Sequence, residues 1–266
     1  MNDILFLKLG GSLLTDKTGV EAVRGDVLTR LAGEIAAARQ ANPDLKLLLG
    51  HGSGSFGHVA ARKYGTRHGV KTAEGWRGFA EVSASAARLN KLVREALLDA
   101  GVPVLSLQPS ASAVCVNGQI KSLAVSPVEA ALSAGLVPLV YGDVAFDTEM
   151  GGTIISTEEI LSYLAELIRP SWLLLAGETA GVLDNHGRVI PEITRQNSED
   201  IQAALGGSRG TDVTGGMASK VNNMITLAEQ FPGLYIRIFS GMVEGELTRA
   251  ILNPAQASGT RLFHPA

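Results

Sequence analysis

The chain has 266 residues, and its 23 basic against 26 acidic side chains give a formal net charge of −3, which excludes the basic surface typical of nucleic-acid binders. Apolar residues make up 45% of the sequence and charged residues only 18%, which excludes a disordered chain and provides for a large core. The single cysteine, Cys115, excludes an internal disulfide, and no apolar run reaches the length of about 18 residues that a membrane span needs. The N-terminus lacks the basic region of a signal peptide, so we expect a cytoplasmic protein.

Short apolar runs alternate along the chain with longer stretches of helical periodicity. The apolar runs have the pattern of strands buried on both faces: Ile4–Leu9, Leu45–Leu49, Val102–Leu107, Val137–Tyr141, Trp172–Ala176 and Leu234–Phe239. The helical stretches are Asp26–Ala41, with Asp26 as its expected cap, Glu74–Asp99, Ser126–Ser133, Glu158–Ile168, Ser198–Leu205 and Met217–Gln230. The alternation predicts an α/β protein, a three-layer αβα sandwich with a central, mostly parallel sheet.

Two segments break this alternation. Asn117-Gly118 lies between apolar residues, which is the strongest short signal for a hairpin. Residues 144–155, with Gly151-Gly152, indicate a second hairpin or a looped excursion. No linker of proline or serine divides the chain, so we expect residues 1–170 and 171–266 to share one continuous sheet.

Glycine is the residue in excess, with 31 copies, or about 12% of the chain against an average of about 7%. A first group, Gly10-Gly11-Ser12, directly follows the first predicted strand. Lys8 lies within that apolar strand, where an unpaired ammonium group is costly. It is either a lysine at a sheet edge or one directed at a phosphate above the glycine turn. Lys17 follows in a polar loop.

A second group of glycines lies between Gly50 and His58, after the second predicted strand and at the start of a helix. Its spacing formally matches a dinucleotide-binding motif, but no acidic residue ends a following strand, and no Gly-Lys-Ser/Thr of a Walker A loop follows. We therefore interpret the segment as an anion-binding turn of another kind. His58 lies on the first turn of the helix, near the anion, whereas His51 has a structural role.

A third group of glycines spans Gly206–Gly216, and Lys220 follows one turn into the next helix. Backbone amides, a helix N-terminus and an ammonium group again suit an anion. Three such turns indicate a ligand with several phosphates, and phosphoryl transfer depends mainly on positioning and charge neutralisation.

At these residues the sequence resembles the amino-acid kinase superfamily and, within it, the isopentenyl phosphate kinases, over nearly its whole length. The matching segments are Lys8–Ser12 with Lys17, Gly52–His58, Tyr141–Val144, Ile154–Ser156 and Asp212–Met217 with Lys220. The resemblance implies the superfamily's fold, a homodimer, and transfer of the γ-phosphate of ATP, bound with Mg²⁺, to isopentenyl phosphate. It also implies that residues 1–170 hold the acceptor and residues 171–266 the nucleotide.

The resemblance further implies roles for individual residues. It assigns ATP to Lys8, Gly10, Gly11, Ser12, Gly54, Gly216 and Lys220. Lys17 would stabilise the transferred phosphoryl group, and Asp143 would orient Lys8 and Lys17, although a role in a turn suits Asp143 equally well. The acceptor phosphate would lie on the Ser53 backbone and the His58 ring. No protein motif for a metal is visible.

The sequence departs from the family pattern at several of these positions. Ser156-Thr157-Glu158 stands where the family usually has Ser-Gly-Asp, so Thr157 takes the place of a glycine that contacts substrate phosphate. Ser53 also replaces a usual glycine. Near the nucleotide, Glu178 can substitute for a family acid, but Ala180 cannot.

Two other functions fit the same residues. One is a kinase of this superfamily for another small acceptor, such as a phosphonate like fosfomycin, a carbamate or an acylamino acid. An apolar pocket beside Phe79 and Val82 would favour an isoprenoid chain, whereas converging Arg or Lys side chains would favour a carboxylate. The other is a sensor or storage module that binds a nucleotide without turnover. The joint presence of Lys8, Lys17 and His58 favours an enzyme.

Overall fold

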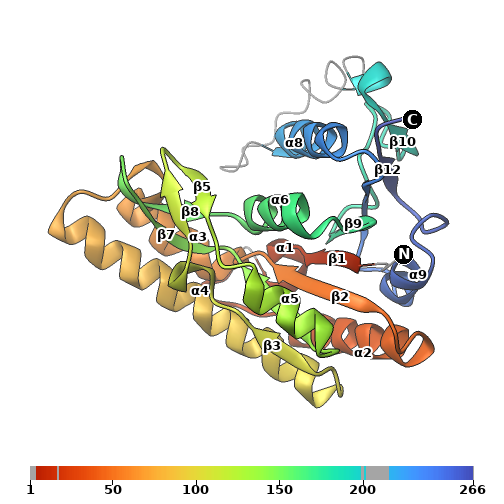
Figure 1. Ribbon diagram of the computed structural model, residues 1–266, viewed down its shortest axis with the longest axis horizontal. Helices are drawn as coiled ribbons and strands as arrows, with labels where there is room; N and C mark the ends of the chain where they lie inside the picture. The colour runs from red at the N-terminus through yellow and green to blue at the C-terminus, as the bar shows by residue number, and fades with distance from the viewer. Residues whose placement is uncertain (1–3, 17, 199–200, 202–215, 266) are drawn as a thin grey trace.

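The computed structural model describes residues 4–16, 18–198, 201 and 216–265. An eight-stranded sheet has the order β10-β12-β11-β9-β1-β2-β6-β3, and a separate four-stranded sheet has the order β5-β4-β7-β8 (Figure 1). The predicted α/β architecture is confirmed, and the large sheet contains strands from both halves of the chain.

The six predicted strands are all present, and neighbours among them pair in parallel. They are β1 (Ile4–Leu9), β2 (Lys46–His51), β3 (Val104–Ser106), β6 (Val137–Tyr141), β9 (Trp172–Gly177) and β11 (Tyr235–Ser240). Two short strands at one edge of the sheet were not predicted. These are β10 (Glu192–Ile193) and β12 (Thr260–Leu262), and β12 pairs antiparallel with β11.

Five of the predicted helices are present as α2 (Gly25–Ala41), α4 (Ala73–Asp99), α5 (Ser126–Ser133), α6 (Thr157–Ile168) and α8 (Gly216–Gln230), and α3 (Gly54–Tyr64) is the helix expected at the second glycine group. The helices α1 (Gly11–Leu14) and α9 (Glu246–Leu252) and the 3₁₀ turns η1 (Thr66–His68) and η2 (Pro109–Ala111) were not predicted. The expected cap of α2 is wrong, because the helix begins after Arg24 and places Asp26 in its first turn, where a carboxylate favours the helix dipole. Most of the predicted helix Ser198–Leu205 lies outside the described residues.

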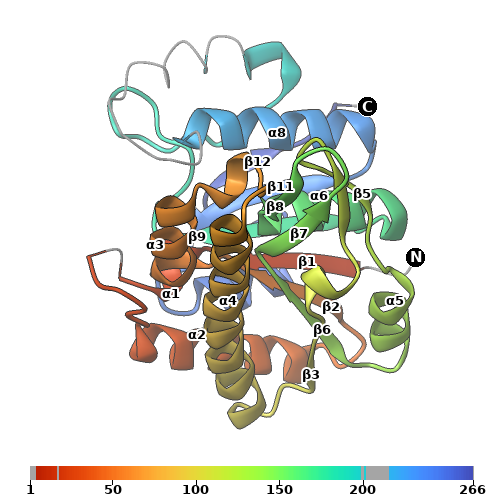
Figure 2. The same cartoon turned by 90° about the vertical axis from the view of Figure 1, so that its left-hand side faces the viewer.

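The central strands of the large sheet, β9, β1, β2 and β6, are buried on both faces because helices cover both. Leu5, Leu7 and Leu9 of β1 face a core that α2, α4 and α9 complete. Phe6 faces the opposite core, which α5, α6 and α8 complete. Figures 1 and 2 both show α2 on one side of β1 and α6 and α8 on the other. Lys8 is two residues from Phe6, so strand alternation directs its side chain toward α6 and α8.

The small sheet consists of two hairpins, and both predicted hairpins are confirmed. In the first, β4 (Val114–Val116) and β5 (Gln119–Ser122) join through Asn117 and Gly118, whose φ angles of 53° and 80° are those of a type I′ turn. In the second, β7 (Asp143–Asp147) pairs antiparallel with β8 (Gly151–Ile155). Among the described helices, none has the length and apolar character needed to cross a membrane.

Two glycine turns leave the large sheet side by side and pack backbone against backbone. One follows β1 and the other follows β2, its neighbour in the sheet. A Cβ atom added to Gly11 would overlap the backbone of Gly54, and one added to Gly52 would lie 2.8 Å from the Gly11 nitrogen. Gly54 also has a φ of 50°, a conformation that residues with a Cβ rarely adopt. The close approach of the two turns therefore requires glycine at these positions.

We expect Gly11→Ala to lower the free energy of unfolding by about 1–3 kcal/mol, because backbone atoms of Gly54 cannot move aside like a flexible side chain. Gly33→Ala is the matched control. Gly33 is exposed in α2, where nothing lies within 4 Å of an added Cβ, and alanine there should stabilise the protein by about 0.5–1 kcal/mol. Urea unfolding of both variants measures the difference, and equal effects of the two substitutions would contradict the described packing.

Candidate active site

The candidate active site lies where the parallel strands β9, β1, β2 and β6 end side by side at their carboxyl ends. The chain leaves β1 for β2 on one side, whereas β9 lies on the other side of β1. Open parallel sheets bind ligands in the crevice at such a change of direction. Both glycine turns open toward this edge, and the first turns of α1 and α3 follow them there.

Side chains of the first turn hold the second in place. The Thr15 hydroxyl donates to the Gly11 carbonyl at 2.8 Å and accepts from the Ser55 amide at 2.9 Å. The Ser55 hydroxyl accepts from the Ala22 amide at 3.2 Å. The segment that returns from the first turn is fixed to α4 as well, because the Glu21 carboxylate accepts from Arg88 and from Ser85. These bonds join the β1 turn, α3 and α4 into one unit.

Lys8 is a buried lysine in the centre of the sheet, so the interpretation of Lys8 as an edge residue is wrong. Its ammonium group forms an ion pair with the carboxylate of Glu158, which lies in the first turn of α6. Lys220 of α8 lies 3.7 Å from the same carboxylate oxygen, measured from its Nζ atom. One carboxylate thus holds two ammonium groups at the edge of the sheet to which the glycine turns open.

Glu158 remains ionised despite its burial. Burial raises the pKa of this carboxyl group, but the charges of Lys8 and Lys220 outweigh that effect and lower the pKa from the ordinary 4.5 to about 2. Burial and the charge of Lys220 lower the pKa of Lys8, and the charge of Glu158 opposes this decrease. With both lysines protonated, the three groups carry one net positive charge, which suits a bound anion.

The Asp143 carboxylate binds backbone amides in this structure, and its role in orienting Lys8 and Lys17 stays a prediction, because Lys17 lies outside the described residues. Its buried carboxylate accepts from the backbone amides of Ser110 at 3.2 Å and Val144 at 2.8 Å. Both bonds fix the turn from β6 into β7, which is the alternative role that the sequence left open. The acid that pairs with Lys8 is Glu158, because α6 covers the face of β1 toward which Lys8 points.

The model of the amino acid kinase family matches residues 3–240. The chain belongs to the amino acid kinase family. It is 34% identical over 269 residues to the isopentenyl phosphate kinase of Methanothermobacter thermautotrophicus, with 97% of this chain and 98% of that protein covered. The isopentenyl phosphate kinase of Haloferax volcanii is 38% identical over 228 residues, with 84% and 88% covered.

Solved structures agree with this membership of the amino acid kinase family. An isopentenyl phosphate kinase structure superposes with a TM-score of 0.81 at 30% identity, covering 97% of this chain and 99% of that one. The N-acetylglutamate synthase of Neisseria gonorrhoeae has a TM-score of 0.67 at 16% identity and shares the fold over 62% of its own chain. The resemblance predicted from the sequence is therefore confirmed.

Thr157, which takes the place of a family glycine expected to contact substrate phosphate, turns its side chain inward. Its hydroxyl donates to the His51 carbonyl at 2.6 Å, and its methyl group occupies the space above Gly50. A Cβ atom on Gly50 would lie 2.7 Å from that methyl group. Gly50 thus makes room for the larger residue, and Thr157 fixes the end of β2.

Ser53 and His58, the residues predicted to bind the acceptor phosphate, are described only in part. Ser53 is the residue that precedes α3, and its side chain makes no capping hydrogen bond to that helix. His58 is the fifth residue of α3, one position beyond the first turn, but its side chain lies outside the described part of the structure.

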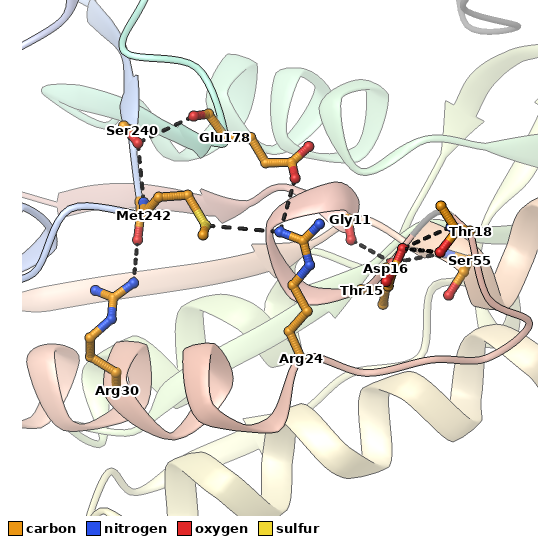
Figure 3. A network of polar contacts seen from close by, with 11 residues as sticks. Gly11, Thr15, Asp16, Thr18, Arg24, Arg30, Ser55, Glu178, Ser240 and Met242 are labelled. Carbon is orange, nitrogen blue, oxygen red and sulfur yellow. Dashed lines mark hydrogen bonds and ion pairs between the residues drawn. The ribbon is translucent and has the colours of Figure 1, made fainter.

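Glu178, which is predicted to lie near the nucleotide, follows β9 and lies beside the end of β11. Its carboxylate pairs with Arg24 at 2.9 Å, and its carbonyl accepts from the Ser240 hydroxyl at 3.3 Å (Figure 3). The Ser240 hydroxyl in turn accepts from the Met242 amide at 3.1 Å. These contacts place the predicted nucleotide residue at the same edge of the sheet as Gly10.

The remaining predicted residues lie partly inside and partly outside the described structure. Lys17 and most of the third glycine group, residues 206–215, lie outside the described residues, and Gly216 is the first residue of α8. Gly10 and Ser12 lie at the start of α1. Within the described ranges, no group of three or more His, Cys, Asp or Glu side chains could hold a metal ion.

Sequence reasoning missed Glu158, Arg24 and Thr15. Glu158 is the instructive case, because it was seen only as a departure from a family pattern. A lysine inside a buried strand needs a carboxylate on the same face of the sheet. The signal that could have identified Glu158 is its position in the first turn of α6, the helix that follows β8.

We expect Glu158→Gln to lower the free energy of unfolding at pH 7 by about 1–3 kcal/mol, since it leaves the buried Lys8 without its counter-charge. The pKa of Glu158 is lower in the folded protein, so its ionised form stabilises the fold above its ordinary pKa of 4.5. The deficit of the variant should therefore shrink as the pH falls from about 4.5 toward 2.

Urea unfolding at several pH values measures this deficit. Glu166→Gln, an exposed change in the same helix, is the control and should have little effect at any pH. A Glu158→Gln deficit that does not vary with pH would contradict the ionised state assigned to Glu158.

Proposed function

We propose that this protein transfers the γ-phosphate of ATP to isopentenyl phosphate, giving isopentenyl diphosphate and ADP. The observation that carries the proposal is the pairing of Lys8 and Lys220 with one carboxylate, Glu158, at the glycine turns. The near full-length similarity to proteins named isopentenyl phosphate kinase supports this choice of acceptor. The nucleotide would enter as MgATP, with the cation carried by the substrate phosphates.

The chemistry of a phosphate acceptor suits these residues. A phosphate monoester has a second pKa of about 6, so its attacking oxygen is already ionised near neutral pH and needs no strong general base. The protein must instead offset the repulsion between two anions, which ammonium groups and backbone amides do without reorganisation. We propose that Lys8 and Lys220 neutralise the ATP phosphates and that Lys17 stabilises the transferred group.

The remaining residues divide between the two substrates. We propose that the ATP phosphates lie on the backbone of the first glycine turn, at Gly10, Gly11 and Ser12, and at the starts of α3 and α8, at Gly54 and Gly216. Glu178 lies near the nucleoside. The acceptor phosphate lies on the Ser53 amide and the His58 ring. The side chain of Thr157 points inward to His51, so the group that Thr157 offers to the acceptor phosphate is its backbone amide at the start of α6. The usual family glycine would offer the same group.

An apolar cluster next to α3 supports an acceptor with a hydrocarbon tail. Val70, Phe79, Val82 and Val144 are buried together, and Ile154 packs against them. Arg67, a basic residue beside this cluster, is occupied by Glu159 at 2.6 Å and by the Ile154 carbonyl. An unoccupied guanidinium group there would instead have favoured a carboxylate on the acceptor.

We also propose that residues 1–170 hold the acceptor and residues 171–266 the nucleotide, in a cytoplasmic homodimer. The buried, unpaired Cys115 fits a reducing compartment. Exposed Val114, Val116 and Phe146 on the small sheet give a surface for the second copy.

The acceptor is tested by measuring ADP release with isopentenyl phosphate, dimethylallyl phosphate, fosfomycin, carbamate and N-acetylglutamate. We expect the highest kcat/KM with isopentenyl phosphate. A higher value with any of the last three would identify a different kinase of the family. ATP binding without turnover of any acceptor would identify a nucleotide sensor.

We expect His58→Ala to lower kcat/KM for isopentenyl phosphate by about 100-fold, because one charged group on the acceptor phosphate is lost. The affinity for MgATP should change by less than about 3-fold. His68→Ala, an exposed histidine in η1, is the control for loss of an imidazole. Steady-state kinetics and calorimetric titration with ATP separate the two effects, and equal losses in both would exclude the role assigned to His58.

A further inference from the structure

The buried His51 is a titratable group that the proposed function does not use. It ends β2, directly before Gly52, and its ring stacks on Tyr141 with centroids 5.5 Å apart and an angle of 9° between the planes. Its Nδ1 atom lies 3.1 Å from the Gly52 carbonyl oxygen, and its Nε2 atom lies 3.1 Å from the Asn90 amide nitrogen. Both ring nitrogens therefore have partners in the core.

These partners determine where the ring proton lies. A carbonyl oxygen only accepts, so Nδ1 must carry the hydrogen that reaches Gly52. The Asn90 amide oxygen accepts from the Ser106 hydroxyl at 2.5 Å, which leaves its NH₂ group facing His51, so Nε2 is the acceptor. Burial lowers the pKa of His51 to about 4, so the ring is neutral at physiological pH. In this series of hydrogen bonds, Ser106 therefore donates to Asn90, Asn90 to His51, and His51 to the Gly52 carbonyl.

The bond to Gly52 has a consequence for the next residue. The Gly52 carbonyl and the Ser53 amide belong to one planar trans peptide unit, in which C=O and N–H point in opposite directions. Glycine on one side of that unit offers little resistance to its rotation. Fixing the carbonyl inward on His51 therefore directs the Ser53 amide outward.

Neighbouring contacts hold the rest of this turn. Thr157 fixes the carbonyl of His51 itself, and the Gly52 amide donates to the Leu9 carbonyl at 3.0 Å. The orientation of the next peptide unit, between Gly52 and Ser53, therefore depends on the His51 side chain. Packing alone would not need this arrangement, because an apolar ring could stack on Tyr141 without desolvating two nitrogens.

We propose that His51 is a positioning residue for the acceptor phosphate, which sets the direction of the Ser53 amide through the Gly52 carbonyl. Asn90 and Ser106 hold the ring in the tautomer that this bond requires. The proposal rests on the proposed function, which places the acceptor phosphate on the Ser53 amide.

Two variants separate the two sides of the ring. In His51→Asn the amide nitrogen takes the place of Nδ1 and can still donate to the Gly52 carbonyl. In His51→Gln the amide oxygen takes the place of Nε2 and keeps the Asn90 contact but not the Gly52 one. Both variants lose the ring and its stacking on Tyr141, so each serves as the control for the other.

We expect His51→Gln to raise KM for isopentenyl phosphate at least about 10-fold above that of His51→Asn, as loss of an oriented donor to an anion predicts. KM for MgATP should differ between the variants by less than about 3-fold. Equal acceptor KM values in the two variants would overturn the positioning role. Absence of any turnover of isopentenyl phosphate by the unmodified protein would instead contradict the proposed function.

A second measurement uses the unmodified protein and does not depend on activity or on the folding of a variant. Nitrogen-15 spectra of the histidine rings should show His51 at pH 7 with the proton on Nδ1 and none on Nε2. Ser106→Ala should let the Asn90 amide reorient and increase the share of the other tautomer. A ring protonated at Nε2 in the unmodified protein would overturn the inference.

Discussion

A buried ammonium group in the central strand is the constraint on which the rest of the site depends. Lys8 lies between β9 and β2, where solvent cannot neutralise its charge, so a carboxylate must approach from the helices on its face. That carboxylate comes from α6, whose start is held by a capping box of Ser156 and Glu159. The same carboxylate oxygen also forms an ion pair with Lys220 of α8. Elements from both halves of the chain thus converge on one charge.

The glycine excess has more physical origins than the one that the sequence alone suggested. We expected the glycines to let backbone approach phosphate. In the structure, Gly11, Gly52 and Gly54 first of all let two turns approach each other. Gly50 has a third use, because it makes room for the methyl group of Thr157. An anion would therefore meet a surface that two interlocked turns have built, rather than two independent flexible loops.

The sequence predicted those elements whose burial follows a regular pattern. Strands such as β6, and β1 apart from Lys8, are apolar because helices cover both faces, and this leaves a continuous pattern. The two-residue β10 and the three-residue β12 are too short to show a period, so the sheet edge was missed.

In the site, Lys8 and the glycine turns were recognisable because each is costly without a ligand or partner. The pairing of Lys8 with Glu158 was not, since it depends on which helix covers which face. Asp143 shows the same limit, because the family resemblance implied a role beside the lysines, whereas the carboxylate accepts hydrogen bonds from backbone amides in the structure.

The packing of the two glycine turns against each other also affects how readily their backbone amides open to solvent. Glycine-rich segments ordinarily exchange their amide hydrogens with solvent quickly, because they open often. Here the amides of Gly10, Gly52 and Ser55 donate to Ala176, Leu9 and Thr15, at 2.8, 3.0 and 2.9 Å. Two of these acceptors belong to the central strands themselves. We therefore expect hydrogen exchange at Gly10 and Gly52, whose acceptors lie in β9 and β1, to require opening of the sheet, unlike exchange in an ordinary glycine-rich loop.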